Sequence, residues 1–323
     1  MTANPAELNE LAIRLGDAGV AGFCATTLSA PADELRAVTE KLGKWIRREP
    51  NSKPSSDRAA LPLGIHLEGP FISSGACGAH PPGAIRPIDL REVESLWEIS
   101  QKTLKIMTVA PEAIAPKDRA RFFRFCRDRE IRLALGHSSC SEQIAREAFD
   151  HGFGGVTHAW NAMSFHHRAP GIMGAALGRK RLHIELILDQ IHVSPTLLRW
   201  TLDLHRHAGP VCFVSDAAPA AGTSGRNWHP FGPLKIRFQD GASRLPDGSL
   251  AGGGILLPEA YRCWLIQEAA HTGQPIAQLL KRTLKHVTSD PLSVLSVPAR
   301  RLGNRRFVWK VEENQLSFTR DSI

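Results

Sequence analysis

The stretch GIHLEGPFISSGACGAHPPGAI (residues 64–85) opens with a short apolar run that carries a histidine and a carboxylate. A continuous apolar run followed by Gly-Pro is typical of a buried strand in a parallel sheet. His66 and Glu68 are two residues apart, so both side chains point to the same face of that strand. The pattern therefore places reactive side chains at the carboxyl end of a buried strand.

The same arrangement recurs along the chain, because short apolar runs alternate with longer segments of helical period. Strands are predicted over residues 22–27, 62–68, 104–109, 131–137, 154–159, 183–189 and 211–216. Helices are predicted over residues 6–17, 31–48, 90–101, 116–128, 141–151, 195–208, 256–271 and 276–286. Ser139 and Glu142 have the spacing of a capping box at the start of the fifth of these helices. The repeated β-then-α order predicts an α/β fold with a parallel sheet, either doubly wound or closed into a barrel.

The polar residues choose between the two architectures, because they stand at the carboxyl ends of several different strands. Besides His66 and Glu68, the polar residues at strand ends are His137, His158, Asp189 and Asp216. A (β/α) barrel carries its chemistry on that face, and no G-x-G-x-x-G of a dinucleotide-binding sheet follows a strand. The sequence therefore predicts a TIM-like barrel. Only seven strands are found and the chain opens with a helix, so we expect the first strand of the barrel to be missing.

The last third of the chain has a different composition. The Gly- and Pro-rich stretch after Asp216 predicts a β-hairpin or an irregular excursion. The segment RRFVWKVEENQLSFTR near the end reads as two short strands. We expect an incomplete barrel over residues 1–299 and a separate C-terminal β segment over residues 300–323.

The composition excludes several classes of protein. The net charge of +8 comes from scattered basic residues, and no block of five or more of them has interleaved aromatics. This favours solvated helix faces over an anion-attracting mouth and does not support nucleic-acid binding. The six cysteines form no C-x-x-C and suggest reduced thiols. The first residues lack the pattern of a signal peptide, and no apolar stretch approaches the length of a membrane span. We therefore expect a cytoplasmic protein that acts on a small molecule.

Glu68, His137 and His158 form a plausible set of metal ligands. Two histidines and one carboxylate commonly hold catalytic zinc and leave one position open for water. The metal lowers the pKa of that water and polarises a carbonyl, and Asp216 is placed to act as general base and then as general acid. Taken singly, each residue also fits an ordinary hydrogen-bonding role, and spacing alone leaves both readings open. We expect His66 to support its neighbours rather than to bind metal.

A series of longer motifs resembles the N-acetylglucosamine-6-phosphate deacetylase family of the amidohydrolase superfamily. The motifs are HLEGPF, GAHPPGAI, VAPE, LGHSSCS, VTHAWNAMSFHHRAPGIMGAAL, IELILDQIHVSP, FVSDAAPAAG and LAGGGILLPEAYR, in this order. The resemblance covers about residues 9–297. It implies a TIM-like barrel with a small β-sandwich, a homodimer, and hydrolysis of the acetamide of an amino-sugar phosphate.

The resemblance also assigns roles to individual residues. It implies that Glu68, His137 and His158 bind the metal and that Asp216 is the catalytic acid/base. His80 and His192 match substrate-contacting positions. The residues that match the phosphate-binding segment are Asn161, Ala162 and Arg168.

The chain departs from the family pattern at several places. The first strand of the family, with its His-x-His pair, is not found, so we expect one divalent metal, most plausibly zinc, rather than two. Ala169 stands where Glu is usual, Gly253 where Ser is usual, and Trp160 where Phe is common. Two alternatives remain open: a catalytically impaired relative that binds sugar phosphates, and a hydrolase for a different N-acyl substrate.

Overall fold

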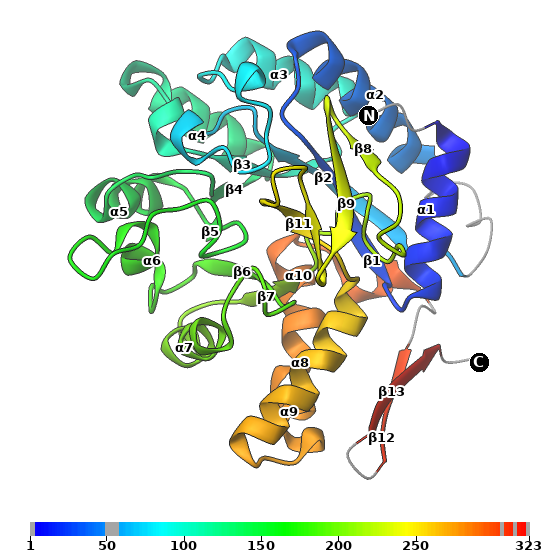
Figure 1. Ribbon diagram of the computed structural model, residues 1–323. Coiled ribbons are helices and arrows are strands. Elements are labelled where there is room, and N and C mark those ends of the chain that lie inside the picture. The colour runs from blue at the N-terminus through cyan, green and yellow to red at the C-terminus, as the bar shows by residue number, and fades with distance from the viewer. Residues whose placement is uncertain (1–3, 49–57, 304–306, 313–314, 321–323) are drawn as a thin grey trace.

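The computed structural model describes residues 4–48, 58–303, 307–312 and 315–320. Its centre is a parallel sheet of seven strands that follow one another in space as they do in sequence. Figure 1 shows these strands curled around a common centre with helices on the outside. The strands are β1 (Gly22–Thr27), β2 (Leu61–Glu68), β3 (Leu104–Val109), β4 (Arg132–Leu135), β5 (Gly155–Val156), β6 (His183–Ile187) and β7 (Val211–Val214). The predicted α/β barrel architecture is confirmed.

The strands are apolar without alternation because helices cover their outer side and the barrel interior covers the other. Every residue of β2 and of β6 is buried. Ile65 and Leu67 of β2 are at most 1% exposed, whereas their neighbours His66 and Glu68 point toward the interior of the barrel. A one-residue shift in register would exchange these two sets of side chains, so burial fixes the register of the strand.

Except for the short helix over residues 171–176, which was not predicted, the helices around the sheet begin and end close to their predicted limits. They are α1 (Pro5–Asp17), α2 (Ala32–Arg48), α3 (Leu90–Ile99), α4 (Arg119–Asp128), α5 (Glu142–His151), α6 (Gly171–Ala176) and α7 (Pro195–His205). The predicted capping box of α5 is wrong. The cap is Ser141, whose hydroxyl accepts a hydrogen bond from the N–H of Ile144. A capping box does occur at α1, where the Asn4 side chain and Glu7 bond reciprocally to each other's backbone N–H.

The sheet has two edges, β1 and β7. The described residues pair β1 only with β2, and β7 only with β6, so they form no eighth strand between the edges. The expected count of seven strands is confirmed. Most of β1 is only partly buried, as expected at an edge.

A second, antiparallel sheet follows the last strand of the barrel. It contains β8 (His229–Phe231), β9 (Leu234–Gln239), β10 (Ala242–Arg244) and β11 (Leu250–Gly253). The region predicted as a hairpin or an irregular excursion is therefore a sheet of four strands. Its inner face packs Ile236 and Ala251 against Ala79 and Ala218, which belong to loops near the barrel mouth. A bridge between Ala217 and Gly253 ties β11 to the segment that follows β7.

The chain then forms a group of helices that pack beside β7, and it ends in a hairpin. The helical elements are α8 (Leu257–Thr272), α9 (Ile276–Thr283), η5 (Leu284–Val287), α10 (Ser289–Val294) and η6 (Ala299–Leu302). The two predicted terminal strands are present as β12 (Phe307–Glu312) and β13 (Gln315–Arg320), and they pair with each other. Trp309 packs edge-on against Tyr261 of α8, and Leu316 belongs to the main core. The hairpin therefore packs on the barrel domain without extending its sheet.

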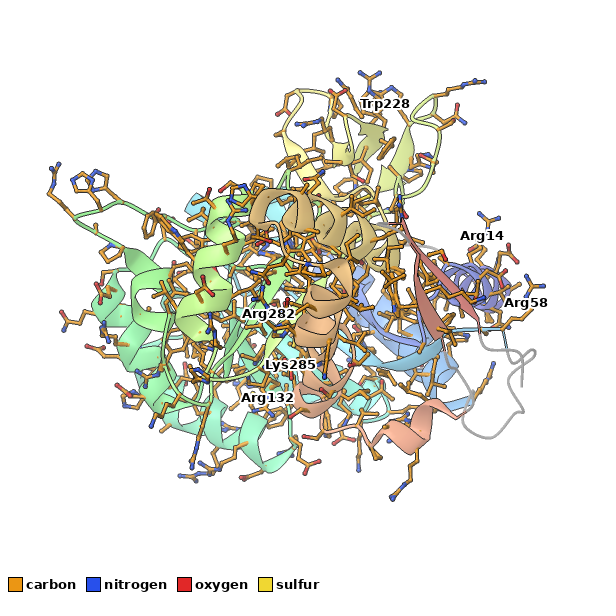
Figure 2. All side chains as sticks on the ribbon, turned by 90° about the horizontal axis from the view of Figure 1, so that it is seen from below. Arg14, Arg58, Arg132, Trp228, Arg282 and Lys285 are labelled. Carbon is orange, nitrogen blue, oxygen red and sulfur yellow. The ribbon has the colours of Figure 1, made fainter. Side chains whose placement is uncertain are left out.

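The basic residues are dispersed over the surface. Figure 2 shows Arg14 and Arg58 at one edge of the molecule, far from Arg282 and Lys285. Arg14 pairs with Glu10 at 2.8 Å, and Arg58 pairs with an exposed aspartate of α1. Exposed pairs of this kind contribute little to stability, so they act mainly as a solvated surface. Among the described residues, none of the helices is both long and apolar enough to cross a membrane.

Candidate metal centre and substrate site

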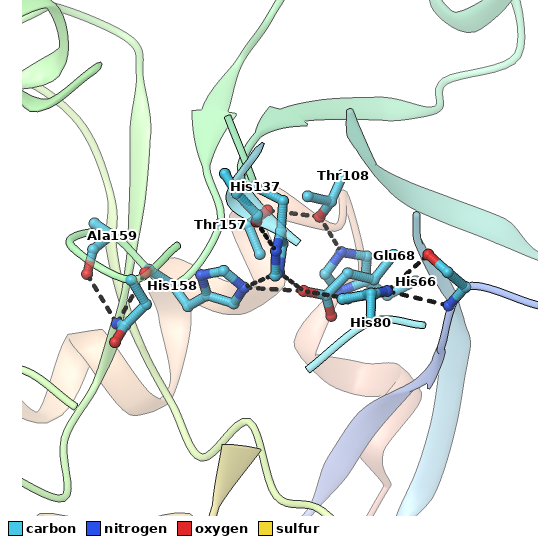
Figure 3. Close-up of polar contacts among 11 residues, drawn as sticks. His66, Glu68, His80, Thr108, His137, Thr157, His158 and Ala159 are labelled. Atoms are coloured by element: carbon cyan, nitrogen blue, oxygen red, sulfur yellow. Dashed lines mark hydrogen bonds and ion pairs between the residues drawn. The ribbon is translucent and has the colours of Figure 1, made fainter. Parts of the chain in front are cut away.

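Glu68 stands at the last position of β2 and is the centre of a buried polar cluster (Figure 3). Its Oε1 atom lies 3.0 Å from His137 Nε2 and 2.9 Å from His158 Nε2. The two histidine nitrogens are 3.0 Å apart. The three predicted ligands, which come from three different strands, are therefore brought together within 3.0 Å of one another.

The two histidines reach this point because the chain leaves the sheet just before each of them. His137 and His158 follow β4 and β5 by two residues, and both have positive φ, of 48° and 29°. Asp216 follows β7 in the same way, with φ of 47°. Histidine and aspartate tolerate this left-handed region better than most residues, and such conformations are concentrated at functional sites.

The hydrogen bonds of His137 favour metal binding. Its Nδ1–H donates to the carbonyl oxygen of Ala76 at 2.9 Å, so the neutral ring carries a lone pair on Nε2. Burial and the neighbouring His158 lower the pKa of His137 to about 4, although the contact with Glu68 works in the opposite direction. The neutral ring thus directs an electron pair at the carboxylate oxygen of Glu68, and a cation between the two atoms removes their repulsion.

The distances also fit a small divalent cation. Tetrahedral ligands about 2.0–2.1 Å from zinc are about 3.3 Å from one another. The observed separations of 2.9–3.0 Å need to widen by only a few tenths of an ångström. Burial by itself would raise the pKa of Glu68, but the contacts with its neighbouring histidines hold it well below its ordinary value. The carboxylate is therefore ionised, as a ligand must be.

His80 is the fourth member of the cluster. Its Nε2 lies 3.8 Å from Glu68 Oε1, and with Glu68 and His137 it forms a second group of possible ligands within 4.8 Å. The backbone N–H of Ser29 donates to His80 Nδ1 at 3.1 Å. This bond keeps the lone pair on Nδ1, so in the neutral ring the proton is on Nε2. His80 therefore presents a hydrogen-bond donor toward the site, which favours the substrate-contacting role over metal ligation.

A glycine makes the Ser29–His80 contact possible. Gly69 has φ of 64°, and a Cβ atom there would lie 2.1 Å from Ser29 Oγ and 3.2 Å from His80 Nδ1. Any side chain would push the serine or the histidine away. The Gly-Pro that follows Glu68 therefore serves the site as well as the turn.

His66 has the supporting position expected from the sequence. Its Nε2 lies 2.7 Å from Thr108 Oγ1, which in turn lies 2.7 Å from Thr157 Oγ1. This chain of hydrogen bonds links β2, β3 and the segment after β5 beside the predicted ligands (Figure 3). His66 and the two threonines therefore fix the relative positions of the strands that carry Glu68 and His158.

Asp216 interacts electrostatically with Glu68 and His158, without a direct hydrogen bond to either among the described residues. Burial and the charge of Glu68 raise the pKa of Asp216 to about 6, against the lowering effects of His158 and His192. The N–H of Gly253 donates to the Asp216 carbonyl oxygen at 2.7 Å. A Cβ atom at Gly253 would lie 2.0 Å from the carbonyl oxygen of Ser215, which gives a physical reason for glycine where the family usually has serine.

His192 is held by Asp189, and both follow the end of β6. Asp189 Oδ2 accepts a hydrogen bond from His192 Nδ1 at 2.6 Å, and the two side chains are 2% and 5% exposed. His192 Nε2 is buried and has no hydrogen-bond partner among the described residues. The position agrees with the expected substrate contact, and the partnership with Asp189 is an addition to it.

The remaining predicted residues lie on the loop after β5. The Asn161 side chain donates to the carbonyl oxygens of His158 and Ala159, and Ala162 has φ of 49°. Arg168 is exposed, and its guanidinium contacts the neighbouring His167 at 3.2 Å. The structure thus places Asn161 beside His158, one of the predicted ligands, whereas Arg168 is exposed to solvent.

Several residues of the site could not be predicted from spacing. Ala76 acts through its backbone carbonyl, and Ser29 comes from a segment far from His80 in the sequence. Only Asp189 carried a signal, since it stood among the polar residues at strand ends. The predicted sets of metal ligands and substrate contacts remain interpretations of this geometry.

The fold and the site define an α/β-barrel protein whose polar cluster occupies the carboxyl ends of its strands. No protein-family model matches the chain. It is 30% identical over 275 residues to the N-acetylglucosamine-6-phosphate deacetylase of Lysinibacillus sphaericus, with 83% of this chain and 68% of the relative covered. It is 31% identical to the N-acetylgalactosamine-6-phosphate deacetylase of Escherichia coli O157:H7, with 80% of this chain and 65% of the relative covered. The chain belongs to the N-acetylglucosamine-6-phosphate deacetylase family.

Solved structures agree with this assignment. The N-acetyl-D-glucosamine-6-phosphate deacetylase of Mycobacterium smegmatis, in complex with N-acetyl-D-glucosamine-6-phosphate, aligns with a TM-score of 0.80 at 25% identity. The alignment covers 92% of this chain and 73% of that one. The Thermotoga maritima enzyme aligns with a TM-score of 0.75 at 28% identity over 90% of this chain and 73% of its own. The chain spans 61–68% of the length of the four bacterial curated relatives.

Proposed function

We propose that this chain is a metal-dependent hydrolase that removes the acetyl group from an N-acetyl amino-sugar 6-phosphate. The observation that supports the proposal most directly is the convergence of Glu68, His137 and His158, with Asp216 facing them. The names of the relatives give the substrate class. They include both a glucosamine and a galactosamine derivative, so the proposal covers the class and leaves the sugar to the experiment.

Glu68, His137 and His158 would hold one divalent metal, for which zinc is our proposal. A bound metal of this kind polarises the acetamide carbonyl and makes the attacking water more acidic. Asp216 accepts a proton from that water as it adds to the carbonyl carbon. The same carboxyl then delivers the proton to the sugar nitrogen as the C–N bond breaks, which leaves acetate and a free amine.

The raised pKa of Asp216 suits both halves of this cycle. A general acid–base group works best when its pKa is near the working pH, because it must both take up and release a proton. His80 would donate a hydrogen bond from Nε2 to the substrate, and His192 would contact it beside Asp216. Asn161, Ala162 and Arg168 would bind the phosphate, since a guanidinium beside backbone amides suits an anion.

The proposal extends to the setting of the enzyme. We propose a cytoplasmic homodimer that acts on a small molecule, and light scattering at micromolar concentration measures the dimer. A catalytically impaired relative that only binds sugar phosphates is the main alternative, since β1 and β7 remain edges of the sheet.

The experiment loads the full chain with zinc and follows the release of acetate. N-acetylglucosamine-6-phosphate, N-acetylgalactosamine-6-phosphate and their unphosphorylated forms are the substrates. Asp216→Asn should lower kcat by about 10²–10⁴-fold while leaving the bound zinc in place, because the variant loses only the proton carrier. Binding of the phosphorylated sugars without any acetate release by the wild-type chain would favour the impaired relative. Release from another N-acyl compound but not from these sugars would favour a different substrate.

A further inference from the structure

Asp189 and His192 form a buried acid–histidine pair whose acid has no role in the proposal above. The pair follows β6, and the strand end places it at the mouth of the barrel. Burial by itself would raise the pKa of Asp189, but hydrogen bonds from His192 hold it below its ordinary value. Asp189 is therefore a carboxylate, which can only accept hydrogen bonds.

Both oxygens of this carboxylate are occupied. Oδ1 accepts from the backbone N–H groups of Ile191 and His192, each at 2.9 Å. Oδ2 lies 2.6 Å from His192 Nδ1. Since Oδ1 is held by two backbone donors, the carboxylate cannot turn, and His192 Nδ1 must carry the proton that fills the contact with Oδ2.

The other nitrogen of the ring is left open. In the neutral ring a proton on Nδ1 leaves a lone pair on Nε2, and this atom is buried without a partner among the described residues. Buried polar atoms are rarely left unsatisfied, so a partner is expected to arrive from outside the chain. His192 also acts electrostatically on Asp216, so its ring lies close to the proposed proton carrier.

We propose that Asp189 is a positioning residue that fixes the proton of His192 on Nδ1 and presents Nε2 to an N–H or O–H group of the substrate. The identity of that substrate rests on the proposed function. The position of the ring proton does not, because it is a property of the chain alone.

Asp189→Asn reverses the arrangement without changing its size. The backbone N–H groups of Ile191 and His192 select the amide oxygen for the Oδ1 position. The NH₂ group then faces His192 Nδ1 and donates to it, which moves the ring proton to Nε2. In a Ser–His–Asp triad the corresponding Asp→Asn change keeps the geometry and lowers kcat by about 10⁴-fold through the wrong tautomer.

The first test is nitrogen NMR of the full chain labelled only in its histidines, without added metal. The chain has 14 histidines, and the signals absent from His192→Asn belong to His192. We expect a proton on Nδ1 in the wild-type chain, alone or together with one on Nε2 at low pH, and a proton on Nε2 alone in Asp189→Asn. A wild-type ring protonated only on Nε2, or identical rings in the two chains, would overturn the inference.

The second test is kinetic and uses the zinc-loaded chain. Asp189→Asn and His192→Asn should each lower kcat/KM by about 100-fold or more, and the double variant should lose little beyond the larger single effect. Asp203→Asn on α7 is the matched control, because that exposed carboxylate pairs only with Arg206 among the described residues. Additive losses in the double variant would contradict the positioning role. If the wild-type chain has no activity, the proposed function fails while the NMR result still decides the inference.

Discussion

Asp216 unites three features that rarely occur together in one residue. It has a left-handed backbone, a raised pKa, and an electrostatic interaction with two of the predicted ligands, Glu68 and His158. Gly253 and its neighbour Gly252 approach it so closely that a Cβ atom on either would meet the backbone of Ser215 or Asp216. These contacts and the hydrogen bond from Gly253 hold the backbone of Asp216, which suits a residue that must take up and release a proton at one position.

The pH dependence of the reaction should report this carboxyl. A general base works only when ionised, so kcat/KM should fall about tenfold per pH unit below the pKa of Asp216. That pKa is about 6 without metal, and a nearby cation lowers it, so the fall should begin at or below about pH 6. Initial rates between pH 4 and 9 measure the profile, and the zinc content at each pH separates this effect from metal loss. A fall that begins above pH 7 with zinc still bound would show that another group controls the rate.

Arg168 is the second residue whose role can be isolated. Its guanidinium is exposed and contacts only His167 among the described residues, so it is available to an anion. Arg168→Ala should raise KM for the phosphorylated sugar by about 10- to 150-fold, since a charge-assisted hydrogen bond contributes about 1.5–3 kcal/mol. The unphosphorylated sugar should be unaffected.

Arg127→Ala is the control for this change, because Arg127 is equally exposed and pairs only with the adjacent Asp128 among the described residues. Steady-state kinetics of the three chains on both sugars provide the comparison. Equal effects of Arg168→Ala on the two sugars would contradict a phosphate contact.

At the scale of elements, most of the fold could be predicted from the apolar pattern. β1 and β3 have their predicted limits, because their apolar runs end where the ladder ends. Predicted strands were too long wherever the chain turns into the site. The strand predicted over residues 131–137 ends at Leu135, since His137 adopts positive φ and leaves the sheet. The left-handed backbone that brings His137 into the site also ends the strand. The pattern of residue types does not indicate this change of backbone, so the strand end could not be predicted from it.

Short helices with poor helix formers were missed for a similar reason. α6 has six residues, two of them glycine, and α10 contains a proline near its start. Neither carries a long helical period, and packing against the barrel holds them. The site showed the same division: residues at strand ends were predictable, whereas Ser29 and the Ala76 carbonyl depend on loops that the sequence pattern does not place.

The start of α5 allows a direct test of why the predicted capping box at Ser139 was wrong. Ser141 caps the helix through the N–H of Ile144, whereas Ser139 is exposed two residues earlier. Ser141→Ala should lower the free energy of unfolding by about 0.5–2 kcal/mol, the usual value of a serine cap. Ser139→Ala should change it by less than about 0.5 kcal/mol. Urea unfolding of the two variants compares them, and equal losses would mean that the cap at Ser141 contributes nothing.

At the scale of the whole molecule, the open edge of the barrel sets the main structural question. A closed barrel has no edges, and here β1 and β7 each lack a neighbour among the described residues. The proposed metal ligands stand at the end of β2 and two residues after β4 and β5, on the side of the sheet whose ladder is continuous. The proposed metal centre is therefore built on paired strands and does not depend on the region between the edges.

Metal binding should accordingly stabilise the whole chain with a stoichiometry of one. A ligand at 1,000 times its Kd adds about 4 kcal/mol to the free energy of unfolding if it binds only the folded state. Zinc should therefore raise the Tm by several degrees, and a chelator should reverse the change. Elemental analysis of protein purified without chelator should find one metal per chain.

His137→Ala should abolish both the stabilisation and the bound metal, because it removes the ring that Ala76 orients toward Glu68. His207→Ala, which changes an exposed histidine after α7, should behave as the wild type. Two tightly held metals per chain, or none after zinc loading, would contradict the single site formed by Glu68, His137 and His158.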